Sequence, residues 1–98
     1  MKTIMTSKRA IHKKRYGHIL YLLNINGLMN IEKISDELKQ MEHKSISSNN
    51  LWNHLDKLIK LGLIVKIKKG TYCLSGKGNK LVSAYNLEKQ AEELYENL

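Results

Sequence analysis

The sequence predicts a mostly helical α+β domain that consists of three helices, a β-hairpin and a long C-terminal helix. Apolar residues recur every three or four positions between residues 11 and 61 and again after residue 80, as on one face of a helix. Residues 63–68 instead alternate, and a Lys-Gly pair leads into a second short run with the period of a strand. With 98 residues the chain has the length of one domain, so these elements are expected to share one core.

Capping residues and glycines delimit the three helices. Gly27 ends the first, and Gly17 allows it either to begin near residue 16 or to run through from residue 8. Asn30 is suited to cap the second helix and Ser47 the third, which Gly62 ends. Between these two helices, residues 42–45 are expected to form a polar turn. The apolar residues of the second and third helices are Ile31, Ile34, Leu38, Met41, Leu51, Leu55, Leu58 and Leu61.

The hairpin is expected at residues 63–74, where the pattern changes its period. Lys69 and Gly70 supply a tight, basic turn. Cys73 alternates away from its apolar neighbours, and we expect it to be partly exposed. One face of each strand is expected to carry the apolar residues Leu63, Val65, Ile67, Tyr72 and Leu74.

The last helix is expected to start after Ser75 and to carry a coiled-coil seam, because its apolar residues follow spacings of three, four, three and four. Two heptads are too short to be stable alone, so this helix needs a partner. We expect the partner to be a second copy of the chain, and the alternative is the first helix of the same chain. Residues 1–7 are then a basic arm, 8–75 the main domain and 76–98 the dimerisation helix. The seam residues are Ala84, Leu87, Ala91, Leu94 and Leu98.

The net charge of +8 is distributed unevenly. Residues 1–30 carry six basic side chains and no acid, and residues 57–80 carry seven and again no acid, whereas the last fifteen residues carry four glutamates against one lysine. This polarity indicates a basic face for a polyanion and a separate C-terminal end. The alternative is that the lysines only keep the fold soluble.

Several classes of function are not expected. The single Cys73 excludes an intrachain disulfide, and the four histidines lack metal-ligand spacing, so neither zinc nor another cofactor is expected. A redox role for Cys73 remains an alternative. The sequence contains no run of about 20 apolar residues and no signal-peptide pattern, so we expect a cytoplasmic protein without membrane contact. No catalytic motif or small-molecule site is evident, and an enzyme is not expected.

Three segments together resemble one family. Residues 46–58 (ISSNNLWNHLDKL) resemble the recognition-helix stretch of winged helix-turn-helix regulators, and residues 61–64 (LGLI) resemble their helix-to-wing junction. Residues 72–78 (YCLSGKG) resemble the motif that closes the wing and opens the last helix. The resemblance covers about residues 16–80, and small archaeal and archaeal-virus members with a C-terminal dimerisation helix look most similar. The short wing departs from many larger members and does not favour deep insertion into a minor groove.

The resemblance implies a recognition helix at about residues 47–61, placed in the major groove of double-stranded DNA. We expect Asn49, Asn50 and Asn53 to contact base edges, because an amide both donates and accepts. The alternative is that they are only solvated and capping residues. His54 is expected to support the helix. Trp52 is expected to cover the core from one side, and the alternative is that it stacks on sugars or base edges of the DNA. Backbone contacts are expected from Ser48, Lys57, Lys60, Lys66, Lys68, Lys69, Arg9, Lys13, Lys14 and Arg15.

These observations predict a DNA-binding transcriptional regulator, and in particular a repressor, that acts as a homodimer. One alternative is an architectural, chromatin-type protein that binds DNA with little sequence preference. Another is a winged helix that serves protein–protein assembly, against which the two basic stretches argue. For the basic N-terminal residues, the alternative to DNA contact is that they form a tail that only keeps the protein soluble.

Overall fold

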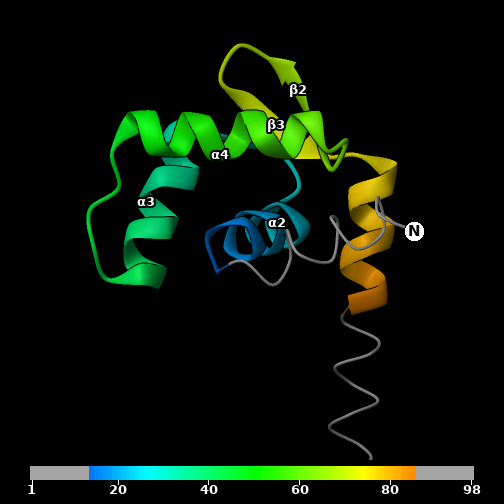
Figure 1. The fold of residues 1–98 in the computed structure, drawn as a ribbon, viewed down its shortest axis with the longest axis horizontal. Helices are drawn as coiled ribbons and strands as arrows, with labels where there is room; N and C mark the ends of the chain where they lie inside the picture. Colours follow the sequence, from blue (N-terminus) through cyan, green and yellow to red (C-terminus); the bar gives the residue numbers. More distant parts are fainter. Residues whose placement is uncertain (1–13, 86–98) are drawn as a thin grey trace, which may run out of the picture.

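The computed structural model describes residues 14–85, with side chains from Arg15 onward (Figure 1). The predicted order of three helices, a hairpin and a further helix is confirmed over this range. Residues 76–85 are helical, and the predicted continuation to residue 98 lies outside the described residues. The named elements are α2 (Lys14–Asn26), β1 (Met29–Asn30), α3 (Ile31–Glu42), α4 (Ser48–Lys60), β2 (Ile64–Lys68) and β3 (Thr71–Leu74).

The caps that the sequence predicts are present. The Asn30 side chain accepts a hydrogen bond from the Lys33 N–H at 2.8 Å, and the Ser47 hydroxyl accepts one from the Asn50 N–H at 3.2 Å. These bonds satisfy backbone donors that the first turns of α3 and α4 would otherwise leave unpaired. Gly62, with a φ of +76°, follows α4 in the left-handed conformation that a glycine adopts without strain.

The sheet has one more strand than the sequence predicted. β1 pairs antiparallel with β3, with Met29 opposite Tyr72, so the strand order is β1-β3-β2. The short β1 directly precedes the Asn30 cap of α3, and the Ile31 N–H also donates to the Gly70 carbonyl. The N-terminal end of α3 is therefore tied to the turn of the hairpin.

A single apolar core lies where α2, α3, α4 and the sheet meet. In Figure 1, α4 crosses above α2, and α3 packs beside both. The side chain of Tyr72 is fully buried in this core. The helix at residues 76–85 contributes Val82, which is 5% exposed. The other buried hydrophobic residues are Ile19, Leu20, Leu22, Leu23, Met29, Ile34, Leu38, Ile46, Leu51, Leu55, Leu58, Leu63 and Ile64.

The predicted face of the first hairpin strand was wrong. Val65 and Ile67 are 41% and 55% exposed, and Ile64 is buried instead. Leu63 is buried too, but it lies before β2, and its N–H donates to the Leu58 carbonyl. Ile64 is the one buried residue of β2, and the pairing with β3 shifts its register between Lys66 and Lys68, so the rest of the strand stands clear of the core.

The predicted polar turn at residues 42–45 was also wrong at its first position. Glu42 is the last residue of α3, and its side chain is only 2% exposed. A carboxylate buried to this extent needs partners, and Arg15 and His18 of α2 provide them.

Candidate nucleic-acid interface

The surface of α4 is divided into an apolar face and a polar face. Leu51, Leu55 and Leu58 point into the core. At 100° per residue, the opposite side of the helix carries a stripe with spacings of four, three and four, and all its members are exposed. We call these residues the outer stripe: Asn49, Asn53, Asp56 and Lys60.

Two of the three predicted base-contacting residues, Asn49 and Asn53, therefore lie at the centre of the exposed face of α4. Asn50 lies at one edge of it, with its side chain exposed. Sequence analysis did not select Asp56, although the spacing of the outer stripe opposite the leucines was sufficient to place it there. Its Oδ2 atom lies 2.9 Å from the Lys60 Nζ atom, one helical turn away.

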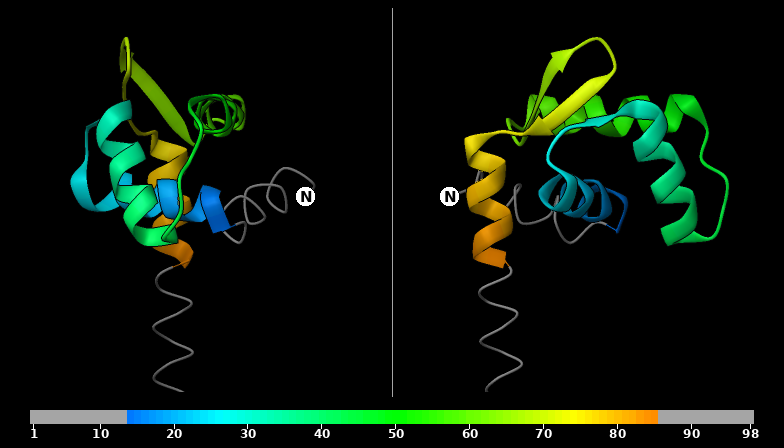
Figure 2. Two further views of the ribbon diagram at one scale, coloured as in Figure 1. Left: turned by 90° about the vertical axis from the view of Figure 1, so that its left-hand side faces the viewer. Right: turned by 180° about the vertical axis from the view of Figure 1, so that it is seen from behind.

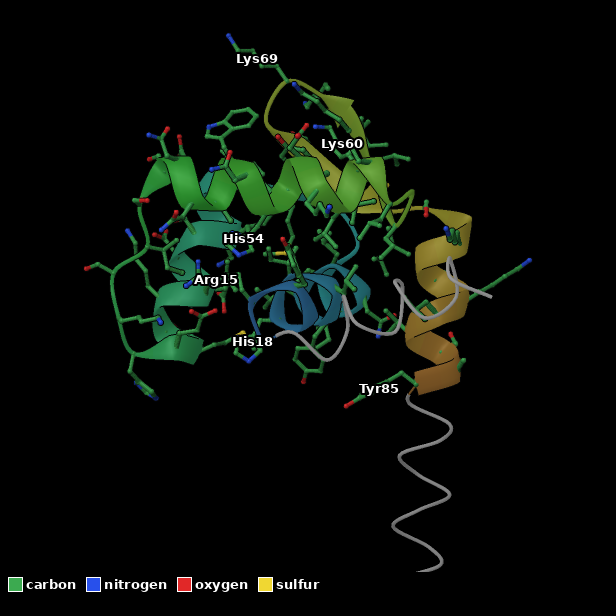
Figure 3. The ribbon with its side chains drawn as sticks, in the orientation of Figure 1. Arg15, His18, His54, Lys60, Lys69 and Tyr85 are labelled. Atoms are coloured by element: carbon green, nitrogen blue, oxygen red, sulfur yellow. The ribbon has the colours of Figure 1, made fainter. Side chains whose placement is uncertain are left out.

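The β2–β3 hairpin, which we call the wing, stands beside α4 (Figure 2). Lys66 of β2 places its Nζ atom 5.7 Å from the centroid of the Trp52 ring, a cation–π contact that links the wing to α4. Lys68 and Lys69 are exposed near the wing tip. Figure 3 shows Lys69 pointing away from the domain, on the same side of α4 as Lys60.

Trp52 lies between α3 and the wing, and its stacking on DNA stays a prediction. It is 45% exposed, so it is not a core residue. One side of it lines a groove of about 380 Å³ between α3 and the start of α4, together with Ser48. Glu32 and Asp36 of α3 line the same groove. The surface beside Trp52 is therefore mixed in charge and not uniformly basic.

Arg15 was predicted to contact the DNA backbone, but its side chain lies neither on the exposed face of α4 nor on the wing. Its Nε atom is 3.0 and 2.8 Å from the two carboxylate oxygens of Glu42, and a terminal nitrogen is 2.7 Å from one of them. The His18 Nδ1 atom lies 3.2 Å from the same carboxylate. Figure 3 shows Arg15 and His18 on the side of α4 opposite to Lys60 and Lys69. Nothing local in the sequence marks these residues, because 27 positions separate Arg15 from Glu42.

This arrangement changes the acidity of Glu42. Hydrogen bonds from the Arg15 guanidinium lower the pKa of the Glu42 carboxyl from 4.5 to about 2, and His18 adds to the effect. Burial opposes this shift but does not cancel it. The Glu42 carboxyl is therefore ionised at neutral pH. Its contacts with Arg15 and His18 join the start of α2 to the end of α3.

The His54 side chain lies on the side of α4 that faces α2, which is the supporting position expected of it. Its Nδ1 atom is 2.6 Å from the Asn50 carbonyl oxygen, and its ring is 4.8 Å from the Tyr16 ring of α2. The ring contact with Tyr16 joins α4 to α2, whereas the contact with Asn50 lies within α4. They place His54 away from the outer stripe.

Other predicted site residues are only partly described. Ser48, Lys57 and Lys60 are exposed on α4, and Lys66 is exposed on the wing. Of the seam, Ala84 alone lies within residues 14–85, where it is exposed, whereas Val82 of the same helix is buried. The remaining calls lie outside the described residues or their side chains: Arg9, Lys13, Lys14, Leu87, Ala91, Leu94 and Leu98.

Among residues 14–85, no group of three His, Cys, Asp or Glu side chains is arranged to hold a metal ion. Within the same range, no helix has the length and apolar character needed to cross a membrane. Cys73 is partly exposed, as the alternation of β3 predicted.

Comparison with known families agrees with this architecture. Residues 10–75 match the family described as the MCM protein C-terminal winged helix-turn-helix domain. Comparisons with curated proteins and with solved structures gave no match. The winged helix resemblance drawn from the sequence is confirmed, and this type of domain indicates DNA binding. The match covers most of the chain, which therefore belongs to the family of MCM protein C-terminal winged helix-turn-helix domains.

Proposed function

We propose that this chain binds double-stranded DNA by placing α4 in the major groove and the wing along the neighbouring backbone. The observation that carries this proposal is the outer stripe, a wholly polar and exposed face of α4. Nothing within the described domain packs on that face. A major groove about 12 Å wide admits a helix of this kind.

The side chains divide into two groups by their chemistry. Asn49, Asn50 and Asn53 can pair with the edge of adenine that offers a donor and an acceptor. The phosphate-contacting group neutralises charge and sets the register of the protein on the duplex, without reading sequence. It comprises Ser48, Lys57, Lys60, Lys66, Lys68 and Lys69, with Arg9, Lys13 and Lys14 at the N-terminal end.

Arg15 is left out of this proposed group. Its guanidinium is occupied by Glu42 and is 17% exposed. Moving it to a phosphate would leave a buried carboxylate without its main partner, which is costly. Its contribution to binding is therefore indirect, through the position of α2.

In its finer form the proposal is a transcriptional repressor that acts as a homodimer through the seam from Ala84 to Leu98. Two copies of α4 would then reach half-sites about 34 Å apart. An architectural protein that binds with little sequence preference remains the alternative. A second candidate rests on the family match, because that family is described by its place at the C-terminus of MCM proteins. On this view the chain is a DNA-contacting domain of an MCM-type protein.

A salt series on random and selected duplexes tests DNA binding. A sequence-preferring regulator should bind its selected duplex about a thousandfold more tightly than random DNA, and Asn53→Ala should remove most of that difference. A steep salt dependence without a difference between the duplexes would favour the architectural alternative. Absence of binding at low salt would contradict both.

Sedimentation tests the dimer independently of DNA. The homodimer requires a wild-type mass of two chains, and Leu87→Asp combined with Leu94→Asp should reduce it to one. Ser83→Asp, an exposed position outside the seam, is the control. An unchanged dimer mass in the double variant would exclude the seam, and a monomeric wild type would exclude the homodimer and favour the MCM-type domain.

A further inference from the structure

We propose that Asp56 is a specificity-determining residue, and that its carboxylate accepts a hydrogen bond from the amino group of a cytosine in the major groove. This inference rests on the proposed DNA binding by α4. On this inference α4 recognises cytosine through Asp56, in addition to the adenines that its asparagines can recognise. The inference also assigns a role to the one acidic residue of α4.

The position of Asp56 is unfavourable for any protein that binds only the phosphates of DNA. It lies in the outer stripe between Asn53 and Lys60, and its side chain is 58% exposed. A carboxylate at that place faces a polyanion, so it weakens binding to every sequence alike. The exposed ion pair with Lys60 offers little compensation, because such pairs contribute little to folding.

A hydrogen-bond donor on the DNA would reverse this effect. The cytosine N4 amino group is such a donor in the major groove, and aspartate is among the residues that accept from it. A carboxylate has about four acceptor positions, so the contact at 2.9 Å with Lys60 leaves capacity for a base. Lys60 also holds the carboxylate in place and reduces its repulsion from the phosphates.

The spacing along α4 places Asp56 next to an asparagine contact. Asn53 and Asp56 are three residues apart, or about 4.5 Å along the helix axis. Successive base pairs are about 3.4 Å apart. For a helix that lies along the groove, Asp56 therefore meets the base pair beside the one that Asn53 meets, so the predicted preference is for cytosine at that neighbouring position.

The test is selection of duplexes from a random pool by the full chain and by two variants. Asp56→Asn removes the negative charge with almost no change of shape. Glu37→Gln is the matched control, because Glu37 pairs with Lys33 at 3.3 Å through the same spacing of four residues. It lies on α3, outside the groove beside Trp52. Both variants raise the net charge by one.

Wild type and Glu37→Gln should enrich cytosine at one position, where replacing it costs about fivefold or more in affinity. In Asp56→Asn the amide oxygen can still accept, but the amide NH₂ now matches the adenine edge, so the preference at this position should move from cytosine to adenine. This variant should also bind random DNA more tightly than wild type. Loss of the cytosine preference in both variants, or in neither, would overturn the role of Asp56. If even the wild type binds no duplex, the proposed function itself has failed.

A second measurement changes the DNA and uses only the wild-type protein, so it does not depend on whether a variant folds. N4-methylcytosine keeps its base pairing but places a methyl group where the amino proton faced the major groove. Wild type should bind a selected duplex with this base about fivefold or more weakly than the unmodified duplex. Equal binding of the two duplexes would show that no protein group accepts a hydrogen bond there, and would overturn the inference.

Discussion

The Arg15 guanidinium donates three hydrogen bonds of 2.7 to 3.0 Å to the Glu42 carboxylate, which lies 27 positions later in the sequence. This pair joins the beginning of α2 to the end of α3, the two helices against which α4 is packed. Glu42 is 2% exposed and Arg15 is 17% exposed, so water screens the pair weakly. The pair lies on the side of α4 opposite to Lys60 of the outer stripe (Figure 3).

Replacing Arg15 by alanine should destabilise the domain by about 3 kcal/mol, because a buried carboxylate loses its main partner. Urea unfolding followed by circular dichroism measures this change. Lys33→Ala breaks the exposed pair with Glu37 and should cost less than about 1 kcal/mol. Equal losses in the two variants would contradict the importance of the Arg15 contact.

The stability of the domain should fall in acid because of Glu42. Its pKa is about 2 in the folded chain and near 4.5 when unfolded, so its contribution is complete above pH 4.5 and is lost as the pH falls toward 2. The loss should be about 2 kcal/mol, after allowance for water that reaches Arg15 and His18. Unfolding between pH 6 and pH 2.5 should show a flatter pH dependence in Glu42→Gln than in wild type. Parallel curves would exclude Glu42 as the source.

Two glycines of the last helix should respond oppositely to alanine. A Cβ atom at Gly78 would overlap the Leu63 carbonyl oxygen, so Gly78→Ala must displace the junction between α4 and the wing. We expect a loss of about 2 kcal/mol. Gly76 has open space around it, and Gly76→Ala should stabilise the chain by about 0.5 kcal/mol. Thermal unfolding of both variants checks this, and a stable Gly78→Ala would show that the helix is not packed against the junction.

Removing the hydroxyl of Tyr72 should stabilise the protein. The side chain is fully buried, and its oxygen has no hydrogen-bond partner in the described structure. Burial also raises the pKa of this phenol. Tyr72→Phe should therefore gain about 1 kcal/mol in chemical unfolding, since an unsatisfied polar group leaves the core. Tyr21→Phe, at an exposed position, should change little. A loss of stability in Tyr72→Phe would mean that the hydroxyl has a partner.

The wing lysines should contribute to affinity but not to sequence preference. Lys68→Gln combined with Lys69→Gln should weaken binding to all duplexes by a similar factor and lower the slope of log K against log salt by nearly two. The control pair, Lys33→Gln with Lys80→Gln, removes the same charge from α3 and the last helix. A larger loss on the selected duplex than on random DNA would indicate that the wing reads bases.

The sequence alone determined the order of the helices and the hairpin and the caps that begin three of the helices. Asn30, Ser47 and Ser75 each cap a helix through a hydrogen bond to a backbone N–H three residues later. Gly62 and Gly70 occupy positions of positive φ, as their place in the pattern predicted. These features are readable because each depends on residues within one turn of the chain.

Only the tertiary structure decided which side chains are free to meet a ligand. It engaged Arg15 with Glu42, brought Lys66 of the wing to Trp52 of α4, and left Val65 exposed. Each of these outcomes depends on packing between elements far apart in sequence, and a lysine or arginine has the same local pattern whether it is paired or free. The physical reason is that capping is a local hydrogen bond, whereas burial and ion pairing are set by the elements that the fold brings together.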